Sequence, residues 1–434
     1  MAFKDERRSL LSPTVRIQIP WIKVTIGTFT FGAFSKVPAS DKDDQDHYWT
    51  TYNVQYPNFV QSLDITKING QVNQYTLILK YPVTQTDDPN FFEKVFSSVS
   101  KTRKITFSYG DMSMPTYIYR EEQAIITKII TGFDLRSGTI QYTVSAVSSC
   151  ALSMGGSWTF QGGDFKPSDR IRDIFRNTKY GLRSIFTGMS ENNIDALIPA
   201  DDKVVHVEAK RNISAIDYIT YLVSYMVPVG TTTGQNASTD IYVLTMHDDT
   251  TFDDEYRDTS VESGSYFKIE RVSYKTNKSD ALQLDIGFGN SGTIVTQFSI
   301  TDDESYALLY DYNDTLVQDQ YVQRISNDGK LEDVWAPTVT SKNNEAITKT
   351  SDMTWWTKIT KYPIKGSLVV MGLLRPAILM SYIRLNVIFP GGRKHIASGL
   401  YLITKQQDRI DANGYRTTLG ITKISGDSSP IFDE

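Results

Sequence analysis

The stretch GLYLITKQQDRIDANGYRTTLGIT, residues 399–422, decides the fold class of this 434-residue chain. Two apolar runs, GLYLIT and TTLGIT, flank the polar run DRIDANGY, whose Asp, Asn and Gly are typical turn residues. We therefore expect two antiparallel strands joined by a turn over residues 408–415. A preceding run, LNVIF, leads into this pair through FPGGRKH, which is also typical of a turn. The end of the chain is thus predicted to be sheet.

Apolar residues alternate with polar ones in several other segments, as in a strand with one buried face. This period of two appears both early in the chain and again near residue 285. The residues predicted to face inward are Tyr75, Leu77, Leu79, Tyr81, Ile105, Phe107, Tyr109, Ile140, Tyr142, Val144, Ala146, Leu282, Leu284, Ile286 and Phe288. Residues 368–389 are interpreted as two buried strands around a turn. Because Arg375, Pro376 and Arg384 interrupt this apolar stretch, we expect no direct membrane insertion.

One helix is predicted among the early strands, in the segment DDPNFFEKVFSSVS. Asp88 suits its N-cap and Pro89 its first helical position. Its apolar stripe consists of Phe92, Val95, Phe96 and Val99. This pattern indicates a helix that packs against a sheet.

Two further helices are predicted in the middle of the chain. In KPSDRIRDIFRNTKYG, Ser168 is the expected N-cap and Gly181 the expected end. In NISAIDYITYLVSYMVP, Ser214 is the expected N-cap and Pro228 ends the helix. The predicted order of the chain is therefore β, then α+β, then β.

Composition excludes several classes of protein. The chain has 45 Lys plus Arg against 50 Asp plus Glu, a formal net charge of −5, so no overall attraction draws it to phosphate backbones. Hydrophobic residues at 40% and charged residues at 22% are typical of globular proteins, and the length favours about two to four domains. The single Cys150 excludes an intramolecular disulfide. The first residues, MAFKDERRSLLSPTV, lack the apolar core of a secretory signal.

Histidine and cysteine provide no catalytic pattern. The histidines His47, His206, His247 and His395 have no metalloprotease spacing, and none lies beside a nucleophile elbow. Ordinary strand or surface positions explain them. Cys150 follows a predicted strand without an activating motif, which favours a buried filler role. We predict no catalytic residue.

Acidic, glycine-rich and tryptophan segments provide no cofactor or metal site either. Residues 41–46, DKDDQD, resemble a calcium loop but have Asp46 where the sharp turn needs Gly. The acidic residues of 248–258 could hold a cation or a glycosidase carboxylate pair, but a solvated loop is the favoured interpretation. GFGNSG lacks the Lys and hydroxyl of a phosphate-binding loop. Trp355 and Trp356 could stack on a carbohydrate, but as neighbours in a strand they would point to opposite faces.

The closing run of the chain, WWTKITKYPIKGSLVVMGLLRPAILMSYIRLNVIFPGGRKHIASGLYLITKQQDRIDANGYRTTLGITKISGD, resembles the end of tail hub proteins of tailed phages. The similarity is carried by GSLVVMGLLRP, SGLYLIT and GYRTTL. ITFSYGD and IERVSYKTNKSDALQLDIGFGN agree with that family in order and distance. PSDRIRDIF followed by NISAIDYITYLV looks like the helical insertion of such hubs. The resemblance covers most of residues 14–426.

The resemblance implies a mainly β chain with two tube-type β-barrel domains and an α+β insertion domain between them. The expected boundaries are a leader at 1–13, a first tube-type β-barrel domain at 14–150, the insertion at 151–260, the start of the second tube-type domain at 261–326, a polar excursion at 327–354, its completion at 355–426 and a tail at 427–434. The excursion is poor in pattern and is expected to fold only against a neighbour.

The resemblance also implies a structural role in the virion, with assembly in the host cytoplasm. A homotrimer with two barrels per chain would continue a hexameric tail tube down to a trimeric spike. The implied partners are the tail tube or a tube-initiator ring, the central spike protein, the tape measure protein and other baseplate proteins. DNA would meet the ring only in transit through its lumen. No enzyme activity and no cofactor are expected, because we find no fused peptidoglycan hydrolase block.

Two alternatives remain at this stage. A distal tail adaptor or receptor-binding tail component would form a hexamer or expose an aromatic sugar site. A glycan or peptidoglycan hydrolase would need its carboxylates in the acidic loop of residues 248–258.

Overall fold

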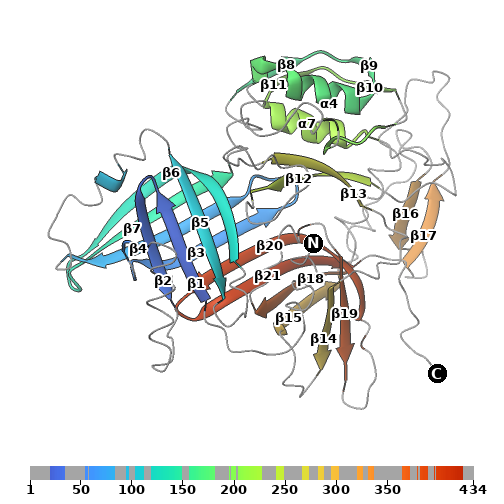
Figure 1. The fold of residues 1–434 in the computed structure, drawn as a ribbon. Coiled ribbons are helices and arrows are strands. Elements are labelled where there is room, and N and C mark those ends of the chain that lie inside the picture. Colours follow the sequence, from blue (N-terminus) through green and yellow to red (C-terminus); the bar gives the residue numbers. More distant parts are fainter. Residues whose placement is uncertain are drawn as a thin grey trace, which may run out of the picture.

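The structure is a computed structural model of the full chain, whose described residues are 20–34, 54–56, 58–83, 94–96, 103–111, 119–148, 156–180, 195, 197–201, 204–226, 241–248, 266–272, 282–287, 295–302, 320–325, 331–336, 364–371, 379, 382–389, 395 and 397–423. Most of these residues lie in strands, and the helices α4 and α7 lie in the middle of the chain (Figure 1). The predicted mainly β class is therefore confirmed. Within the described residues, no helix is both long enough and apolar enough to cross a bilayer.

Strands β1–β7 form what we call the first β unit. They run in the order β3-β4-β7-β6-β5-β1-β2, and neighbours are antiparallel. Their bounds are Pro20–Ile26 for β1, Phe29–Phe34 for β2, Val60–Ile68 for β3, Gln74–Pro82 for β4, Lys104–Asp111 for β5, Tyr119–Asp134 for β6 and Thr139–Ser148 for β7. The alternation predicted for β4 is confirmed, since Tyr75, Leu77, Leu79 and Tyr81 are all buried.

The sheet of the first β unit curls, so that β2, at one end of the strand order, meets Tyr56, which precedes β3 at the other end. Tyr56, just ahead of β3, accepts a hydrogen bond from the Gly32 amide at 3.0 Å and donates its own amide to the Thr30 carbonyl at 3.0 Å. This contact closes the order of strands, as a β-barrel requires. Inside, the rings of Tyr75 and Phe107 stack with centroids 5.1 Å apart. Of the predicted helix here, only Lys94–Phe96 is described, so Asp88 and Pro89 lie outside the described residues.

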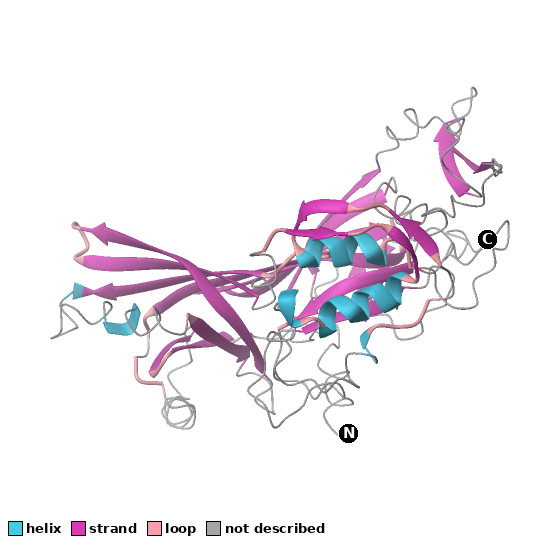
Figure 2. Ribbon diagram, turned by 90° about the horizontal axis from the view of Figure 1, so that it is seen from above, coloured by secondary structure: helices cyan, strands magenta, loops and turns pink. Residues whose placement is uncertain are grey.

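The insertion, by which we mean β8–β13 with α4 and α7, has its own core. Its elements are β8 Trp158–Phe160, β9 Gly163–Phe165, α4 Pro167–Arg176, η4 Thr178–Tyr180, β10 Val205–Val207, β11 Lys210–Ile213, α7 Ala215–Val223, β12 Ile241–His247 and β13 Tyr266–Val272. The two helices pack against each other, and α7 also packs against β12 (Figure 2). The boundary expected at residue 260 falls between β12 and β13, which pair with each other. Phe267 and Ile269 of β13 belong to the insertion core.

The two helices begin in different ways. Ser214 is the N-cap of α7 and accepts a hydrogen bond from the Asp217 amide at 3.1 Å, as predicted. For α4 the prediction was wrong: Lys166 is the N-cap, and Ser168 lies in the first turn. The amide and hydroxyl of Ser168 instead donate to the Asp201 carboxylate, at 3.2 and 2.8 Å. A residue distant in sequence thus satisfies these donors, which a local pattern could not reveal. Gly181 and Pro228 lie outside the described residues.

Six strands form what we call the second β unit, in the order β15-β18-β21-β20-β19-β14. They are β14 Leu282–Gly287, β15 Val295–Asp302, β18 Ile364–Met371, β19 Tyr382–Ile388, β20 Gly399–Asp411 and β21 Gly414–Lys423. β14 and β19 are parallel, and the Cα atoms of β14 and β15 approach within 8 Å. The strands predicted in residues 368–389 are confirmed as β18 and β19, but they pair with other strands and not with each other.

A separate hairpin lies partly within the polar excursion. β16, Gln320–Ile325, pairs with β17, Leu331–Ala336, and β17 falls inside residues 327–354. In this hairpin Val322 pairs with Val334 and Tyr321 with Trp335. These residue types favour strands, although the surrounding sequence is polar. The rest of the excursion, from residue 337, lies outside the described residues.

The hairpin β20–β21 is longer than predicted and joins the two β units. Most of the polar run 408–415 is strand, and the turn comprises Ala412 and Asn413. The far half of β20 pairs with β3 of the first β unit, from Lys405 opposite Ile68 to Asp411 opposite Ser62. One continuous sheet therefore runs through both units (Figure 1).

Candidate functional site at the junction of the two β units

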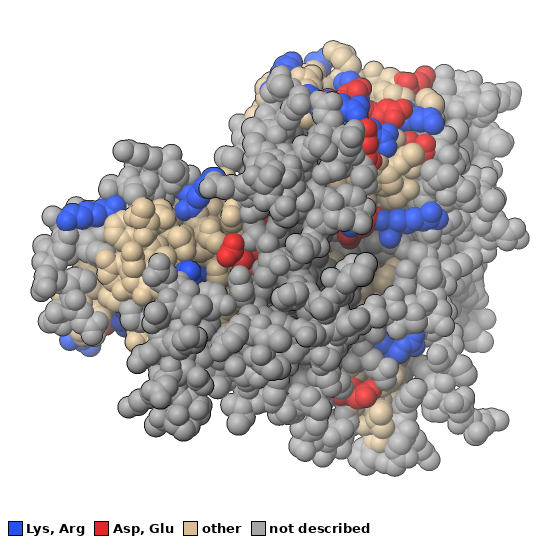
Figure 3. Space-filling view, in the orientation of Figure 1, with Lys and Arg blue, Asp and Glu red and all other residues tan. Residues whose placement is uncertain are grey.

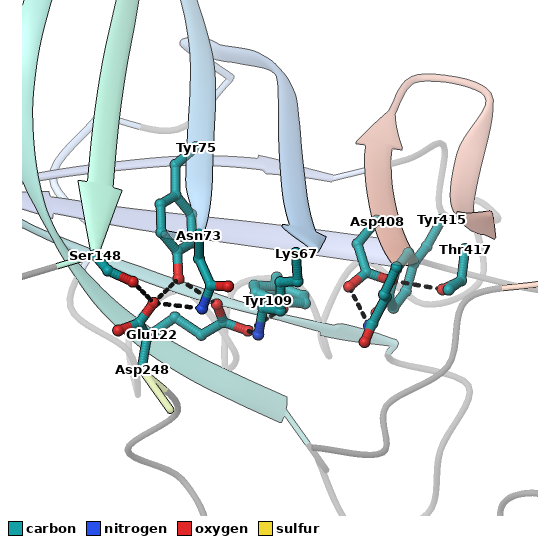
Figure 4. A network of polar contacts seen from close by, with 11 residues as sticks. Lys67, Asn73, Tyr75, Tyr109, Glu122, Ser148, Asp248, Asp408, Tyr415 and Thr417 are labelled. Atoms are coloured by element: carbon teal, nitrogen blue, oxygen red, sulfur yellow. Dashed lines mark hydrogen bonds and ion pairs between the residues drawn. The ribbon is translucent and has the colours of Figure 1, made fainter. Parts of the chain in front are cut away.

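Buried polar side chains meet where β20–β21 crosses from one β unit to the other (Figure 4). We call this group the junction. Its members are at most 5% exposed, and they are Lys67, Asn73, Tyr75, Tyr109, Glu122, Ser148, Asp248, Gln406, Asp408, Tyr415 and Thr417. Buried polar groups of this kind are stable only if they satisfy one another's hydrogen bonds.

Glu122 of β6 accepts hydrogen bonds from side chains of three other strands of the first β unit, β3, β4 and β5. Its Oε1 accepts from Lys67 Nζ at 2.7 Å and from the Tyr109 hydroxyl at 2.8 Å. Its Oε2 accepts from the Tyr75 hydroxyl at 2.7 Å. The Lys67 contact is also an ion pair with both side chains buried. Removing either charge would leave the other buried without compensation, which is costly.

Asp248 connects the insertion to the first β unit. It follows β12 directly, and its Oδ2 accepts hydrogen bonds from Asn73 at 2.7 Å, from Tyr75 at 2.9 Å and from the Ser148 hydroxyl. Its backbone carbonyl accepts from the Gln123 amide at 3.3 Å. One residue of the insertion therefore contacts β4, β6, β7 and the turn before β4.

Asp408 is the centre of the junction on the β20–β21 side. Its Oδ1 accepts from the Thr417 hydroxyl at 2.6 Å and from the Tyr415 hydroxyl at 3.2 Å, and its Oδ2 accepts from Gln406 at 2.6 Å. The Tyr415 ring meets the Tyr109 ring edge to face, with centroids 5.9 Å apart. The Glu122 and Asp408 groups are therefore in contact through two tyrosines.

The environment of Tyr75 keeps its hydroxyl protonated. Burial raises the pKa of Tyr75 well above its usual value, and the nearby Asp248 and Glu122 raise it further. The junction lies inside the protein, so these groups contact one another and not bulk water. Their arrangement fits the task of fixing how the first β unit, the second β unit and the insertion meet.

None of the histidines that the structure describes is a member of the junction. His206 of β10 is exposed and contacts Asp164 at 2.7 Å. His395 accepts a hydrogen bond from the Ala397 amide at 3.1 Å. His247 ends β12, and His47 lies outside the described residues. Within the part of the chain that the structure describes, no three His, Cys, Asp or Glu side chains are grouped as metal ligands.

Several other predicted features cannot be placed, and one expectation was wrong. Cys150, residues 41–46, residues 249–258, Trp355 and Trp356 lie outside the described residues. Asp248 was expected in a solvated loop, yet it is 2% exposed. Its carboxylate is held by first-unit side chains, so it is not open to a glycan substrate.

One feature of the sequence, charged residues at inward strand positions, could have identified the junction. Lys67 follows Ile65 by two positions, Glu122 precedes Ala124 by two, and Asp408 precedes Ile410 by two. Strand alternation therefore places each charged residue on the inward face. A charged residue at an inward position is rarely buried without a partner, which marks such positions for attention.

Comparisons with known proteins found similar solved structures at low identity. No protein-family model matches the chain, and no curated protein matches it. Similar solved structures include the tail protein from Neisseria meningitidis MC58, with a TM-score of 0.47, 10% identity, and coverage of 95% of this chain and 98% of that one. The prophage MuSo2 43 kDa tail protein from Shewanella oneidensis has a TM-score of 0.47 and 9% identity, covering 95% and 100%.

A third similar structure comes from a secretion system. The E. coli c3393 protein, a component of the type VI secretion system, has a TM-score of 0.43 and 9% identity, covering 84% of this chain and 74% of that one. That protein exhibits structural similarity to the T4 bacteriophage tail proteins gp27 and gp5. All three TM-scores are below 0.5, so the fold described above rests on this chain's own strands.

Proposed function

We propose that the chain is a structural subunit of a phage tail, a baseplate hub that forms a trimeric, pseudo-hexameric ring. Such a ring would join the tail tube to the central spike and leave a channel for DNA. Two lines support the proposal. One is the resemblance of residues 355–427 to the end of tail hub proteins. The other is the presence of two curled β units in one chain.

The observation that carries the proposal is the hairpin shared by the two units. Because β20 pairs with β3 and also with β19, the two units belong to one hydrogen-bonded sheet. A pair of units fixed in this way can act as two adjacent positions of a ring, so three chains would close it. A flexible linker between them would not fix that geometry.

An exposed apolar end of the first β unit supports an assembly role. Leu135 is 92% exposed and Phe133 67% exposed at the turn between β6 and β7, and Val83 and Ile130 are close to half exposed. Val83 is adjacent to this turn, since its amide donates to the Gly138 carbonyl at 2.9 Å. Grouped exposed apolar side chains mark contact surfaces. In the proposed ring, we expect a neighbouring copy to cover this end.

Hydrogen bonds within the turn between β6 and β7 hold it in one conformation. The Asp134 carboxylate accepts from the amides of Arg136 and Ser137 at 3.1 and 3.3 Å, and from the Ser137 hydroxyl at 2.6 Å. Gly138 follows with a φ of +61°, which favours glycine. A turn held in this way can present Phe133 and Leu135 at a small entropic cost.

The proposed partners follow from the position of a hub in a tail. They are the tail tube or its initiator ring, the central spike, the tape measure protein and other baseplate proteins. Over the described surface in Figure 3, basic and acidic side chains are intermingled on the insertion. Separately, the net charge of −5 supports a ring whose lumen lets DNA pass without holding it.

The proposal is tested by the symmetry and mass of the purified assembly in electron microscopy. We expect a threefold ring with a wide central hole. A sixfold ring would instead favour the distal tail adaptor, and a monomer at all concentrations would contradict both. Phe133→Ser with Leu135→Ser should prevent ring formation. Val204→Ser, an exposed apolar change on the insertion, is the matched control and should leave the ring intact.

A further inference from the structure

Two carboxyl groups, those of Glu122 and Asp248, lie within hydrogen-bonding distance of the Tyr75 hydroxyl. The Tyr75 hydroxyl has one hydrogen, yet its oxygen lies 2.7 Å from Glu122 Oε2 and 2.9 Å from Asp248 Oδ2. Both distances are those of hydrogen bonds. An ionised carboxylate only accepts hydrogen bonds, so two ionised carboxylates would compete for the single hydrogen.

Tyr75 itself cannot resolve this competition by ionising. Burial raises its pKa well above its usual value, and the charges of Asp248 and Glu122 raise it further. The phenol therefore keeps its hydrogen and donates it to one carboxylate. The other contact is a hydrogen bond only if that carboxyl group is protonated and donates to the phenol oxygen.

The other donors described around the two carboxyl groups do not donate to the Tyr75 oxygen. Lys67 and Tyr109 donate to Oε1 of Glu122, and not to the Oε2 that faces Tyr75. Asn73 and Ser148 donate to Oδ2 of Asp248, the same oxygen that faces Tyr75. They stabilise the two carboxyl groups without providing the missing hydrogen between Tyr75 and its second partner.

We propose that Glu122 and Asp248 share one proton through the Tyr75 hydroxyl, and that this proton latches the insertion to the first β unit. The proton belongs to the pair and not to either residue alone. Like charges separated by a single hydroxyl group in a buried site do not both ionise readily.

The surroundings of the pair are defined strand by strand. The titratable and charged groups that face it from the described elements are Lys67 of β3, Tyr75 of β4, Tyr109 of β5 and, beyond the Tyr109 ring, Tyr415 of β21 with Asp408 of β20. Lys67 offsets one negative charge of the pair. A second negative charge would repel the first across the Tyr75 oxygen.

This repulsion would act between two parts of the chain. Glu122 belongs to β6 of the first β unit, whereas Asp248 directly follows β12 of the insertion. The amide of Gln123, next to Glu122, donates to the Asp248 carbonyl at 3.3 Å. Because the protonated pair is the docked form, docking is complete at acidic pH and is lost as the pH rises.

Infrared spectroscopy of the full chain tests whether the proton is present and shared. At neutral pH, wild type should show the carbonyl band of a protonated carboxylic acid. The band should vanish in both Glu122→Gln and Asp248→Asn, because either change lets the remaining carboxyl group ionise. Asp164→Asn, which alters an exposed carboxylate of the insertion, is the matched control and should keep the band. A band that survives one of the two junction variants would disprove sharing, and a wild type without the band would disprove protonation.

Hydrogen exchange of the Gln123 amide tests the latch. After correction for the intrinsic rate, its protection in wild type should fall about tenfold per pH unit once the pair loses its proton. In Glu122→Gln, the new amide N–H can donate to Tyr75 permanently, so the profile should be flat. Tyr75→Phe should lower the protection at every pH. A flat wild-type profile, or a steep one that persists in Glu122→Gln, would overturn the latch.

Discussion

The hairpin β20–β21 has two halves that face different interiors. In the half nearest the second β unit, the inward residues are apolar and include Tyr401 and Ile403 of β20 and Ile421 of β21. In the half that pairs with β3, Gln406, Asp408 and Thr417 face inward and bond to one another. Apolar packing supplies burial energy without selecting one arrangement, whereas a polar group is stable only in the arrangement that satisfies its bonds.

The boundary between the two halves is a β-bulge at Thr404. Ile403 pairs with Ile421 and Lys405 with Gly420, so Thr404 has no residue opposite it. Before the bulge, odd-numbered residues of β20 face the second core, and after it even-numbered residues face inward. In β21, odd-numbered residues face inward along the whole strand. The extra residue thus changes which residue numbers of β20 face inward, while the pairing with β21 continues on both sides of the bulge.

Insertion of one alanine between Lys405 and Gln406 should have the largest effect on this arrangement. The residues beyond it would shift by one position against β21, which turns Asp408 and Ile410 outward and brings Gln407 and Arg409 inward. Because buried unpaired charges are very unfavourable, we expect the pairing of β20 with β3 to be lost. Hydrogen exchange of the β3 amides would measure this loss. Thr404→Ala keeps the bulge and serves as the control. Equal protection of the β3 amides in both variants would contradict this account of which β20 residues face inward.

Ile421→Ala tests the apolar half of the hairpin. Ile421 is opposite Ile403 and buried in the second core, so its truncation should leave a cavity and lower the free energy of unfolding by about 2–5 kcal/mol. Denaturant unfolding of the full chain would measure it. The β3 amides should stay protected below the transition, because the polar half is intact. Early loss of β3 protection would show that the halves are not separable.

Thr417→Val tests the polar half with little change in volume. It removes the 2.6 Å hydrogen bond to Asp408 while keeping the site filled. We expect a loss of about 1–3 kcal/mol in the free energy of unfolding. A double-mutant cycle with Asp408→Asn would separate this bond from the rest of the group. An unchanged stability would mean that the Asp408 group contributes only to specificity.

Arg409→Ala should have the smallest effect, because this side chain lies on the outward face and is 53% exposed. Its ion pair with Asp411, at 2.8 Å, should contribute less than about 1 kcal/mol. Burial acts to raise the pKa of Asp411, but hydrogen bonds from Arg409 and the Asn413 amide, with the charge of Arg416, hold it below its usual value. This contribution is present above the unfolded-state pKa of Asp411 and is lost as the pH falls. Stability measured against acid should therefore depend less on pH in Arg409→Ala than in wild type.

The sequence by itself determined the local structure. Alternating apolar residues such as Tyr75, Leu77 and Leu79 predicted strands, because the side chains of a strand point to opposite faces in turn. Ser214 predicted the start of α7, because an N-cap acts within three residues of its own position. The composition and spacing of residues also directed attention away from familiar catalytic motifs, and the closing run carried the resemblance to tail hubs.

Only the tertiary structure decided which distant segments meet. No local pattern pairs β20 with β3, and none shows that Asp248 reaches Tyr75 or that Asp201 holds the first turn of α4. Alternation fixed the inward position of Lys67, Glu122 and Asp408, but their partners come from other strands. Local preferences act over a few residues, whereas buried polar groups are stabilised by whatever the fold brings beside them. The junction, and with it the joining of two β units into one sheet, is therefore a property of the folded chain.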